Sequence, residues 1–317
     1  MERLSRPLGV DAQSPAKDRS PVPPRAESLR IDLAGSKLDG MDFLRLRGCA
    51  LQQTVARRNS SLGRVAPPSQ RLLLELAFLR DAPTCIDTLR SDGNDELATA
   101  ISESATLKRS QLPALIFNAT LGNSEYRDFW RTSVPAQNYP EQTSSEVITA
   151  LEQVSDGARR WLSGDYAADD MKFELALSDI ARGDGGELLE ALARQAAYLD
   201  AANAVISAQV DKGPLCRANT QSEAAAIVRT VVNKFFIREV QARAASLGQR
   251  YYDLSEPLRE LEQLLADALP DAYADWRDNR DRRFDAGLKA PRNHVTQLQA
   301  LLGVCYAEFA ARDDSTE

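Results

Sequence analysis

The stretch "SSEVITALEQVSDGARRWLS", residues 144–163, carries the clearest structural signal in the chain. Its apolar residues recur at spacings of four, three, four and three, which is the pattern of an amphipathic helix with one buried face. They are Val147, Leu151, Val154, Ala158 and Trp161, with Leu162 beside the last. The stretch therefore predicts an α-helix that packs through a single apolar stripe.

Helical periodicity continues on both sides of this stretch. The ranges 37–59, 69–81, 94–119, 187–209, 221–247, 256–269 and 290–312 are predicted helices. We expect Pro113 to kink or divide the third of them. "GDGG" at 183–186 and "DKGPL" at 211–215 should separate neighbouring helices. Because no segment alternates as a strand of useful length, the sequence predicts an all-α fold, a multi-helix bundle-like array.

The N-terminal segment 1–36 differs in character from the rest of the chain. Its prolines, with Ser, Lys and Asp around them, predict a largely irregular linker or tether ahead of an all-α domain, 37–317. They are Pro7, Pro15, Pro21, Pro23 and Pro24. A second irregular stretch, "PAQNYPEQT" at 135–143, either divides that domain into two lobes, 37–135 and 143–317, or is a long loop within one domain.

The overall composition argues against several classes of protein. The chain has 317 residues, of which 43% are hydrophobic and 27% charged, as in ordinary soluble domains. A formal net charge of −7 disfavours general nucleic-acid binding, which needs a basic surface. No apolar run predicts a transmembrane helix, and no signal peptide is apparent in the first residues.

Catalytic and metal-binding motifs are sparse. The chain has one histidine, His294, no C-x-x-C pair and no G-x-S-x-G elbow, so we expect no metal site, no cofactor and no catalytic triad. Acid pairs such as Asp169 with Asp170 and Asp184 with Glu187 are interpreted as solvated faces. The segment "WRDNRDRRFD" at 276–285 is interpreted as a salt-bridged surface segment, with a partner-docking face as the alternative.

The segment "RRNSSLGRVAPPSQR", 57–71, contains four arginines and no acid. It is either a plain helix connection, in which cations cap the last carbonyls of the first helix, or a site for an anionic ligand or glycan. The candidate ligand-binding residues are Arg57, Arg58, Arg64 and Arg71, with Asn118 and Arg127 in addition.

The four cysteines leave two interpretations open. They are either buried free thiols or two disulfides, for which three pairings exist. Disulfides Cys49–Cys85 and Cys216–Cys305 would stabilise the folded state by about 4 and about 4.5 kcal/mol. Each would do so by closing a loop and lowering the chain entropy of the unfolded state.

Three blocks of sequence resemble a known family. They are the segment from Asp42 to Ile86, "LPALIFNATLGNSEYRDFW" at 112–130, and "GPLCRANTQSEAAAIVRTVVNKFFIREVQ" at 213–241. They are similar to an uncharacterised gammaproteobacterial domain-of-unknown-function family (DUF 3080-like), whose members look like envelope lipoproteins. The family carries no assigned activity, so the resemblance implies no catalytic residue.

The resemblance implies a periplasm-facing place in the cell envelope, with a lipid anchor on an N-terminal part missing from this chain. Because the periplasm is oxidising, this implied location favours the disulfides Cys49–Cys85 and Cys216–Cys305. The preferred hypothesis is a non-enzymatic envelope protein that binds a partner protein or supports an assembly. The alternatives are a module that binds an anionic envelope component through 57–71, and a hydrolase that uses acidic residues.

Overall fold

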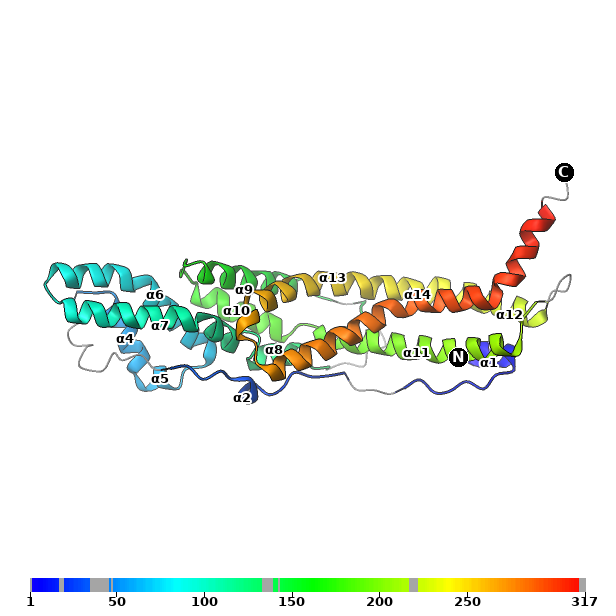
Figure 1. The fold of residues 1–317 in the computed structure, drawn as a ribbon, viewed down its shortest axis with the longest axis horizontal. Coiled ribbons are helices and arrows are strands. Elements are labelled where there is room, and N and C mark those ends of the chain that lie inside the picture. The colour runs from blue at the N-terminus through cyan, green and yellow to red at the C-terminus, as the bar shows by residue number, and fades with distance from the viewer. Residues whose placement is uncertain are drawn as a thin grey trace.

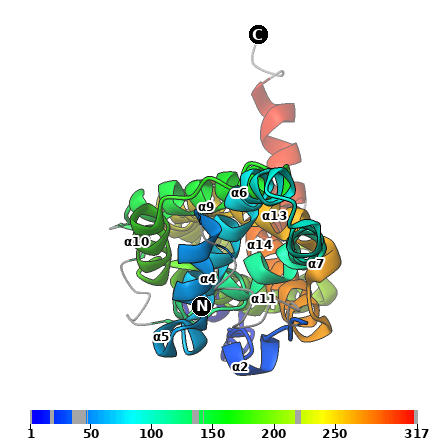
Figure 2. The ribbon, with the colours of Figure 1, turned by 90° about the vertical axis from the view of Figure 1, so that its left-hand side faces the viewer.

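The computed structural model confirms the all-α prediction. It describes residues 2–16, 20–34, 46, 48–132, 139–141, 143–216 and 222–313, and every regular element in these ranges is a helix. The helices lie mostly along one direction and form an elongated body (Figure 1). Seen along the long axis, α2 (Ala26–Leu29) and α5 (Ser61–Arg64) lie on the side opposite α6 (Pro68–Ser91) and α9 (Glu146–Leu162) (Figure 2).

Helix α9 carries the apolar stripe predicted for residues 144–163. Val147, Leu151, Val154, Ala158 and Trp161 are all buried. They face α10 (Asp170–Ala181) and α13 (Gln241–Leu264), which pack against α9. A single stripe is enough here because the opposite face of α9 stays in solvent.

One end of the body is a helical hairpin made of α6 and α7 (Asp95–Ala119), with α4 (Leu51–Asn59) packed against it (Figure 1). The other end is built around α11 (Gly185–Lys212) and α14 (Asp271–Asp313), the pair of helices in most extensive contact. The short helices α1 (Glu2–Leu8) and α12 (Glu223–Val231) pack there too. The remaining elements are α8 (Ser124–Phe129), the π-helix η1 (Val232–Val240) and the 3₁₀ turn η2 (Ala266–Ala268).

Several predicted helix boundaries were wrong. Pro113 does not divide α7, because Leu112 and Ile116 beside it are buried in the packing with α6, which compensates for one lost hydrogen bond. The predicted helices 221–247 and 256–269 form one helical run from α12 through η1 to α13. The last helix begins at Asp271 rather than at 290.

Within the described residues, the predicted helix 37–59 is present from Leu51 to Asn59, as α4. Leu51 is the first residue of α4, and Gly48 just before it has a φ of 89°, a left-handed conformation that a helix does not continue through. Residues 35–45 and 47 lie outside the described residues. The division of the chain at residue 36, and the division into lobes 37–135 and 143–317, both stay predictions.

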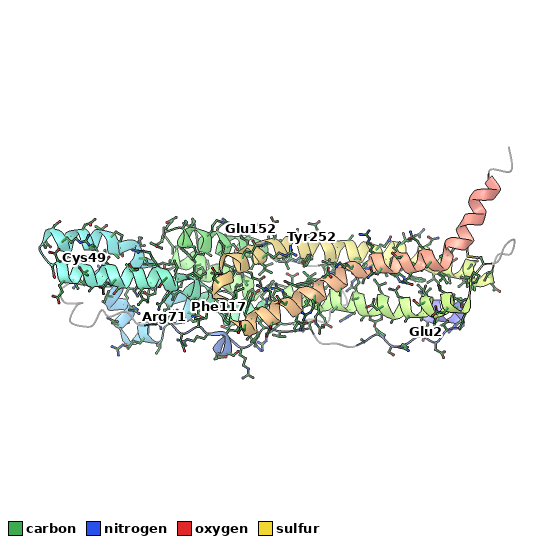
Figure 3. All side chains as sticks on the ribbon, viewed as in Figure 1. Glu2, Cys49, Arg71, Phe117, Glu152 and Tyr252 are labelled. Carbon is green, nitrogen blue, oxygen red and sulfur yellow. A yellow bond between two sulfur atoms is a disulfide. The ribbon has the colours of Figure 1, made fainter. Side chains whose placement is uncertain are left out.

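Among the described residues, most of the buried apolar side chains belong to two clusters, and each cluster contains one disulfide. The first cluster lies among α4, α6–α10 and parts of α11, α13 and α14, and it includes Cys49 and Cys85. The second lies at the end where α1, α11, α12 and α14 meet, and it includes Cys216 and Cys305. Both predicted pairs are bonded, with Cα–Cα distances of 5.2 Å and 5.4 Å. Figure 3 labels Cys49 at the hairpin end and Glu2 at the opposite end.

His294 lies beside the second cluster and is structural. Its Nδ1 is 2.6 Å from the Asn203 side-chain oxygen, and its ring packs edge-on against Phe236 at 4.7 Å between centroids. The residue is only 3% exposed. Burial lowers its pKa to about 4, so the imidazole is neutral in the folded protein at neutral pH.

Acid should therefore weaken the fold through His294. In the unfolded chain the imidazole has its ordinary pKa near 6.5, so between pH 6.5 and 4 the unfolded state binds a proton that the folded state does not. The free energy of unfolding should fall by about 2 kcal/mol from this residue between pH 7.5 and pH 5, and not change through it above about pH 7.5. Urea unfolding of wild type and His294→Gln at both pH values isolates this contribution. The same pH dependence in both proteins would contradict it.

Candidate anion-binding groove

A groove of about 580 Å³ lies where α6 begins, next to the turn between α7 and α8. One wall is made by the N-terminal turn of α6, including Ser69 and Arg71. A second wall is made by Asn118 on α7 and by the start of α8. The N-terminal segment, from Ala26 to Leu33, lines the remaining side. Three segments far apart in sequence thus meet around one hollow.

The first turn of α6 presents a positive end to this groove. Pro67 is the N-cap and Pro68 the first helical residue, a position that suits proline because its missing N–H would be unpaired there anyway. The helix has no side-chain cap and no acid in its first turn. The free backbone N–H groups and the helix dipole therefore favour an anion. Ser69, nine-tenths buried, lines the groove, and its hydroxyl has no hydrogen-bond partner among the described residues.

Three cations gather next to this turn around one acid. Arg58 Nε is 2.9 Å from Glu75 Oε1, and the Lys108 ammonium contacts the other oxygen of Glu75. Arg71 lines the same small pocket as these three side chains. Within the described part of the chain, Arg71 has no ion-pair partner. Three positive charges beside one carboxylate leave a local excess of two, in a chain that is acidic overall.

The pKa of Lys108 reflects the charges crowded around it. Burial lowers the pKa of its ammonium, Glu75 raises it, and the guanidinium groups of Arg58 and Arg71 lower it again. A further anion beside Arg71 would relieve the repulsion among the three cations. The rest of the groove carries three acids, Glu27, Asp32 and Glu125, and one further cation, Arg30, so a bound anion is directed to the α6 wall beside Arg71.

The structure brings together part of the predicted set. Arg58 and Arg71 lie in one cluster, and Asn118 lines the adjoining groove. Arg57 and Arg64 are exposed and lie outside the lining of both hollows. Arg127 donates from Nε to the Pro23 carbonyl oxygen at 3.2 Å. The ligand-binding role of these six residues stays a prediction.

Lys108 and Glu75 were missed by the sequence analysis. Glu75 is the single charged residue of "LLLELAFL", and Lys108, which Arg109 follows, has apolar residues to either side in "ATLKRSQLPAL". A charge in such surroundings is buried and needs a partner of opposite sign. That signal predicts a partner of opposite sign for each residue, but only the fold shows that the two pair with each other.

A second charged cluster corrects the interpretation of 276–285 as a surface segment. Arg280 is 3% exposed. It makes two hydrogen bonds to Glu262, of 2.8 Å and 3.1 Å, and lies against the rings of Trp130 and Trp276 at 5.2 Å and 5.1 Å. Tyr273 donates its hydroxyl to Glu262 at 2.7 Å. One face of the segment is buried because Trp276, Arg280 and Phe284 recur every four residues along α14, whereas its aspartates Asp278, Asp281 and Asp285 are exposed.

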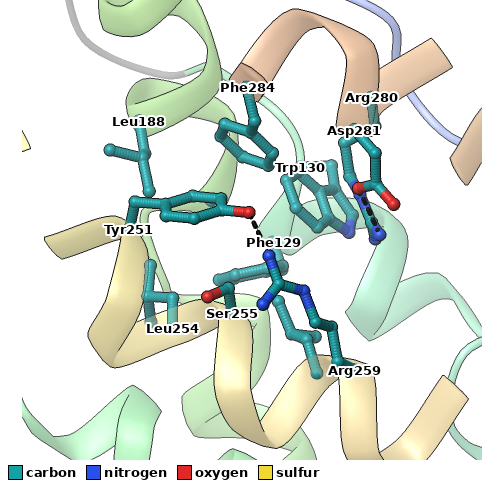
Figure 4. A pocket seen from close by; sticks show the side chains of 12 residues that line it. Phe129, Trp130, Leu188, Tyr251, Leu254, Ser255, Arg259, Arg280, Asp281 and Phe284 are labelled. Atoms are coloured by element: carbon teal, nitrogen blue, oxygen red, sulfur yellow. Dashed lines mark hydrogen bonds and ion pairs between the residues drawn. The ribbon is translucent and has the colours of Figure 1, made fainter. Parts of the chain in front are cut away.

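The pocket beside Arg280 is too small for a ligand. Figure 4 shows it enclosed by Trp130, Phe284 and Tyr251, and its volume is about 20 Å³, room for one water. We therefore assign this cluster to the core.

Asp184 is also held in the structure rather than solvated as expected. It accepts hydrogen bonds from the Tyr139 hydroxyl at 2.6 Å and from Arg250 Nε at 2.9 Å. The next residue, Gly185, must lack a side chain, since a Cβ there would lie 2.4 Å from the Phe129 ring. These contacts hold the start of α11 in place beside the Phe129 ring.

The described residues define an elongated, disulfide-linked helical bundle with a groove that adjoins a cluster of three cations. No group of three or more metal-binding side chains occurs among them, and none of their helices is long and apolar enough to cross a bilayer. The chain belongs to DUF3080, a family described as protein of unknown function, whose model matches residues 1–308. No curated protein and no solved structure matches it.

Proposed function

We propose that this protein is a non-enzymatic binding protein of the cell envelope, and that its groove holds an anionic group of an envelope component. The observation that carries the proposal is the excess of cations at the start of α6, where Arg71 lines both the groove and the pocket around Glu75. This joins the two sequence hypotheses of partner binding and anion binding in one site.

The groups in the groove suit a phosphate or a carboxylate. The backbone N–H groups of Ser69 and Gln70 lie in the uncapped first turn of α6, and the Ser69 hydroxyl adds a further donor. The Arg71 guanidinium supplies two parallel donors, which match the spacing of two oxygens in either group. These are donors and positive charges, which hold a negative group in place, whereas His294 lies in the other half of the molecule.

The disulfides support an extracytoplasmic location. Both join residues of a buried cluster, so each is part of the folded core rather than an exposed, exchangeable pair. Structural disulfides persist where the surroundings are oxidising, as in the periplasm. An anionic partner is then an envelope lipid headgroup or an acidic glycan.

Replacing Arg71 with glutamine should weaken anion binding at least tenfold. The variant loses a charge-assisted hydrogen bond, which contributes about 1.5–3 kcal/mol. Titration calorimetry at low ionic strength with glycerol phosphate, and separately with glucuronate, measures the effect for a phosphate and for a carboxylate. Binding should weaken as salt is added.

The matched control is Arg64→Gln, which removes an arginine of the same segment that lies outside the groove. Its affinity should stay within twofold of wild type. Equal loss in both variants would mean that only the net charge matters, and no binding of either probe by wild type would refute the proposed function.

A further inference from the structure

The connection between α4 and α6 presents two aliphatic side chains to solvent. Leu62 on α5 is 79% exposed, and Val65 just after α5 is 78% exposed. They are the most exposed large hydrophobic side chains in the described part of the chain. No residue of α5 is buried, and neither side chain belongs to a core cluster. Packing within the chain therefore does not account for them.

The backbone of this connection is held in a defined shape. The Ser60 hydroxyl accepts from the Gly63 N–H at 3.0 Å and donates to the Arg57 carbonyl oxygen at 2.7 Å. Gly63 lies directly against the end of α4, since a Cβ there would be 2.1 Å from the Arg57 carbonyl oxygen. With Gly63 facing α4, Leu62 and Val65 on either side of it remain in solvent.

Positive charge accompanies the two aliphatic side chains. Arg57 in the last turn of α4 and Arg64 on α5 are both exposed. Within the described part of the chain, neither guanidinium forms an ion pair. From residue 43 to residue 74 the chain carries no acid, although its formal net charge is −7. The region 57–68, here called the α5 tip, is therefore both apolar and positively charged.

The α5 tip lies at the margin of the elongated body. Figure 1 shows α5 next to α4, and Figure 2 shows it on the outer side of the bundle in the view along the long axis. Pro67 and Pro68 are exposed as well and continue the apolar surface to the start of α6. An external surface can thus contact Leu62 and Val65 without any helix having to move.

This combination suits a lipid bilayer better than a protein partner. A stable protein–protein interface buries about 800 Å² on each side and is enriched in aromatic side chains. The α5 tip offers two aliphatic side chains, and no aromatic residue occurs from residue 44 to residue 77. A bilayer requires less, because a few aliphatic side chains enter the acyl boundary while cations contact the phosphates of anionic lipids.

We propose that the α5 tip docks onto a membrane surface that carries anionic lipids. Leu62 and Val65 enter the boundary between headgroups and acyl chains, and Arg57 and Arg64 contact the lipid phosphates. This contact goes beyond the proposed function, because it needs no anion in the groove and its partner is the bilayer itself. Since Pro67 and Pro68 also line the groove, docking holds the groove close to the headgroups.

Flotation of the full-length protein with vesicles of equal parts phosphatidylglycerol and phosphatidylcholine tests the proposal. The variant Leu62→Ser with Val65→Ser keeps the charge and should lower the partition coefficient at least tenfold. The variant Arg57→Gln with Arg64→Gln keeps the apolar surface and should lower it at least fivefold. Because all four side chains are exposed, both variants should unfold at the wild-type midpoint.

The matched control is Met171→Ser with Leu175→Ser on α10. These two side chains are 73% and 55% exposed, but acids adjoin them in sequence, namely Asp169, Asp170 and Glu174. Their replacement should change vesicle binding less than twofold. Equal losses in the two serine variants would mean that exposed apolar area alone matters, and would overturn the inference.

Tryptophan fluorescence locates Leu62 in the bilayer. The native tryptophans Trp130, Trp161 and Trp276 are at most 6% exposed, so lipids with brominated acyl chains should quench only an added indole. Leu62→Trp should be quenched on anionic vesicles that contain such lipids, and Met171→Trp should not. Quenching of Met171→Trp alone would place the membrane contact on α10 and overturn the inference.

Two further results would overturn it. One is an absence of binding to the anionic vesicles at low ionic strength. The other is a wild-type dimer in light scattering that Leu62→Ser with Val65→Ser abolishes, which would assign these side chains to a second copy. Calorimetry with glycerol phosphate keeps the proposed function separate. The groove alone binds that soluble probe, so neither the serine variant nor Arg64→Gln should alter its affinity.

Discussion

Replacing Arg280 with alanine should destabilise the folded protein by about 3–5 kcal/mol. The substitution leaves the Glu262 carboxylate, itself 5% exposed, without its bidentate partner in the core. It also removes the guanidinium that lies against the rings of both Trp130 and Trp276, to which it is attracted. Urea unfolding with one probe of secondary and one of tertiary structure gives the free energy.

The matched control is Arg277→Ala on the same helix. Arg277 is paired with Asp278, whose side chain is 58% exposed, so its loss should change stability by no more than about 0.5 kcal/mol. The double variant Arg280→Met with Glu262→Gln removes both charges and keeps an acceptor for the Tyr273 hydroxyl. It should recover at least half of the loss. Equal effects of Arg277→Ala and Arg280→Ala would contradict the burial of Arg280 and would mean that its side chain lies on the surface.

Removing the Cys216–Cys305 disulfide should cost about as much, about 4.5 kcal/mol, because it closes the longer loop. The two residues are 89 positions apart and join the segment after α11 to α14 within the second cluster. The paired alanine variant avoids leaving a free thiol. Its unfolding free energy, compared with wild type under oxidising conditions, measures the contribution.

The other disulfide provides the comparison. Cys49 and Cys85 are 36 positions apart, so their paired alanine variant should lose about 4 kcal/mol. A reducing agent should bring wild type close to the variant that lacks both bonds. An unfolding midpoint that reductant does not move would contradict the structural role of both disulfides.

The sequence predicted the helices where a single feature dominates. The stripe of α9 and the glycine break before α11 both appear where expected, since apolar spacing and glycine act locally. The predicted helix boundaries were wrong where packing overrides a local preference, as at Pro113 inside α7. The disulfide pairing followed from the family resemblance, because four cysteines alone permit three pairings.

The candidate site was predictable in part. Arg58 and Arg71 stood out as an arginine-rich segment without acids, but Lys108 comes from another helix and only folding brings it near. Arg280 was misjudged because alternating charges in sequence resemble a solvated face, whereas its partner Glu262 is on a different helix. The packing of residues 20–34 against the body left no pattern in the sequence, because the body binds main-chain groups that every residue has.

Hydrogen–deuterium exchange of the wild-type protein, with and without glycerol phosphate, tests the central claim most directly. If the groove holds an anion, the amide groups of Ser69 and Gln70 should exchange more slowly with the probe present, and so should the peptides that carry Arg71 and Lys108. Peptides from α12 and from the second core cluster should be unchanged. Unaltered exchange at the start of α6 under saturating probe, or protection confined to the other end of the body, would contradict the account.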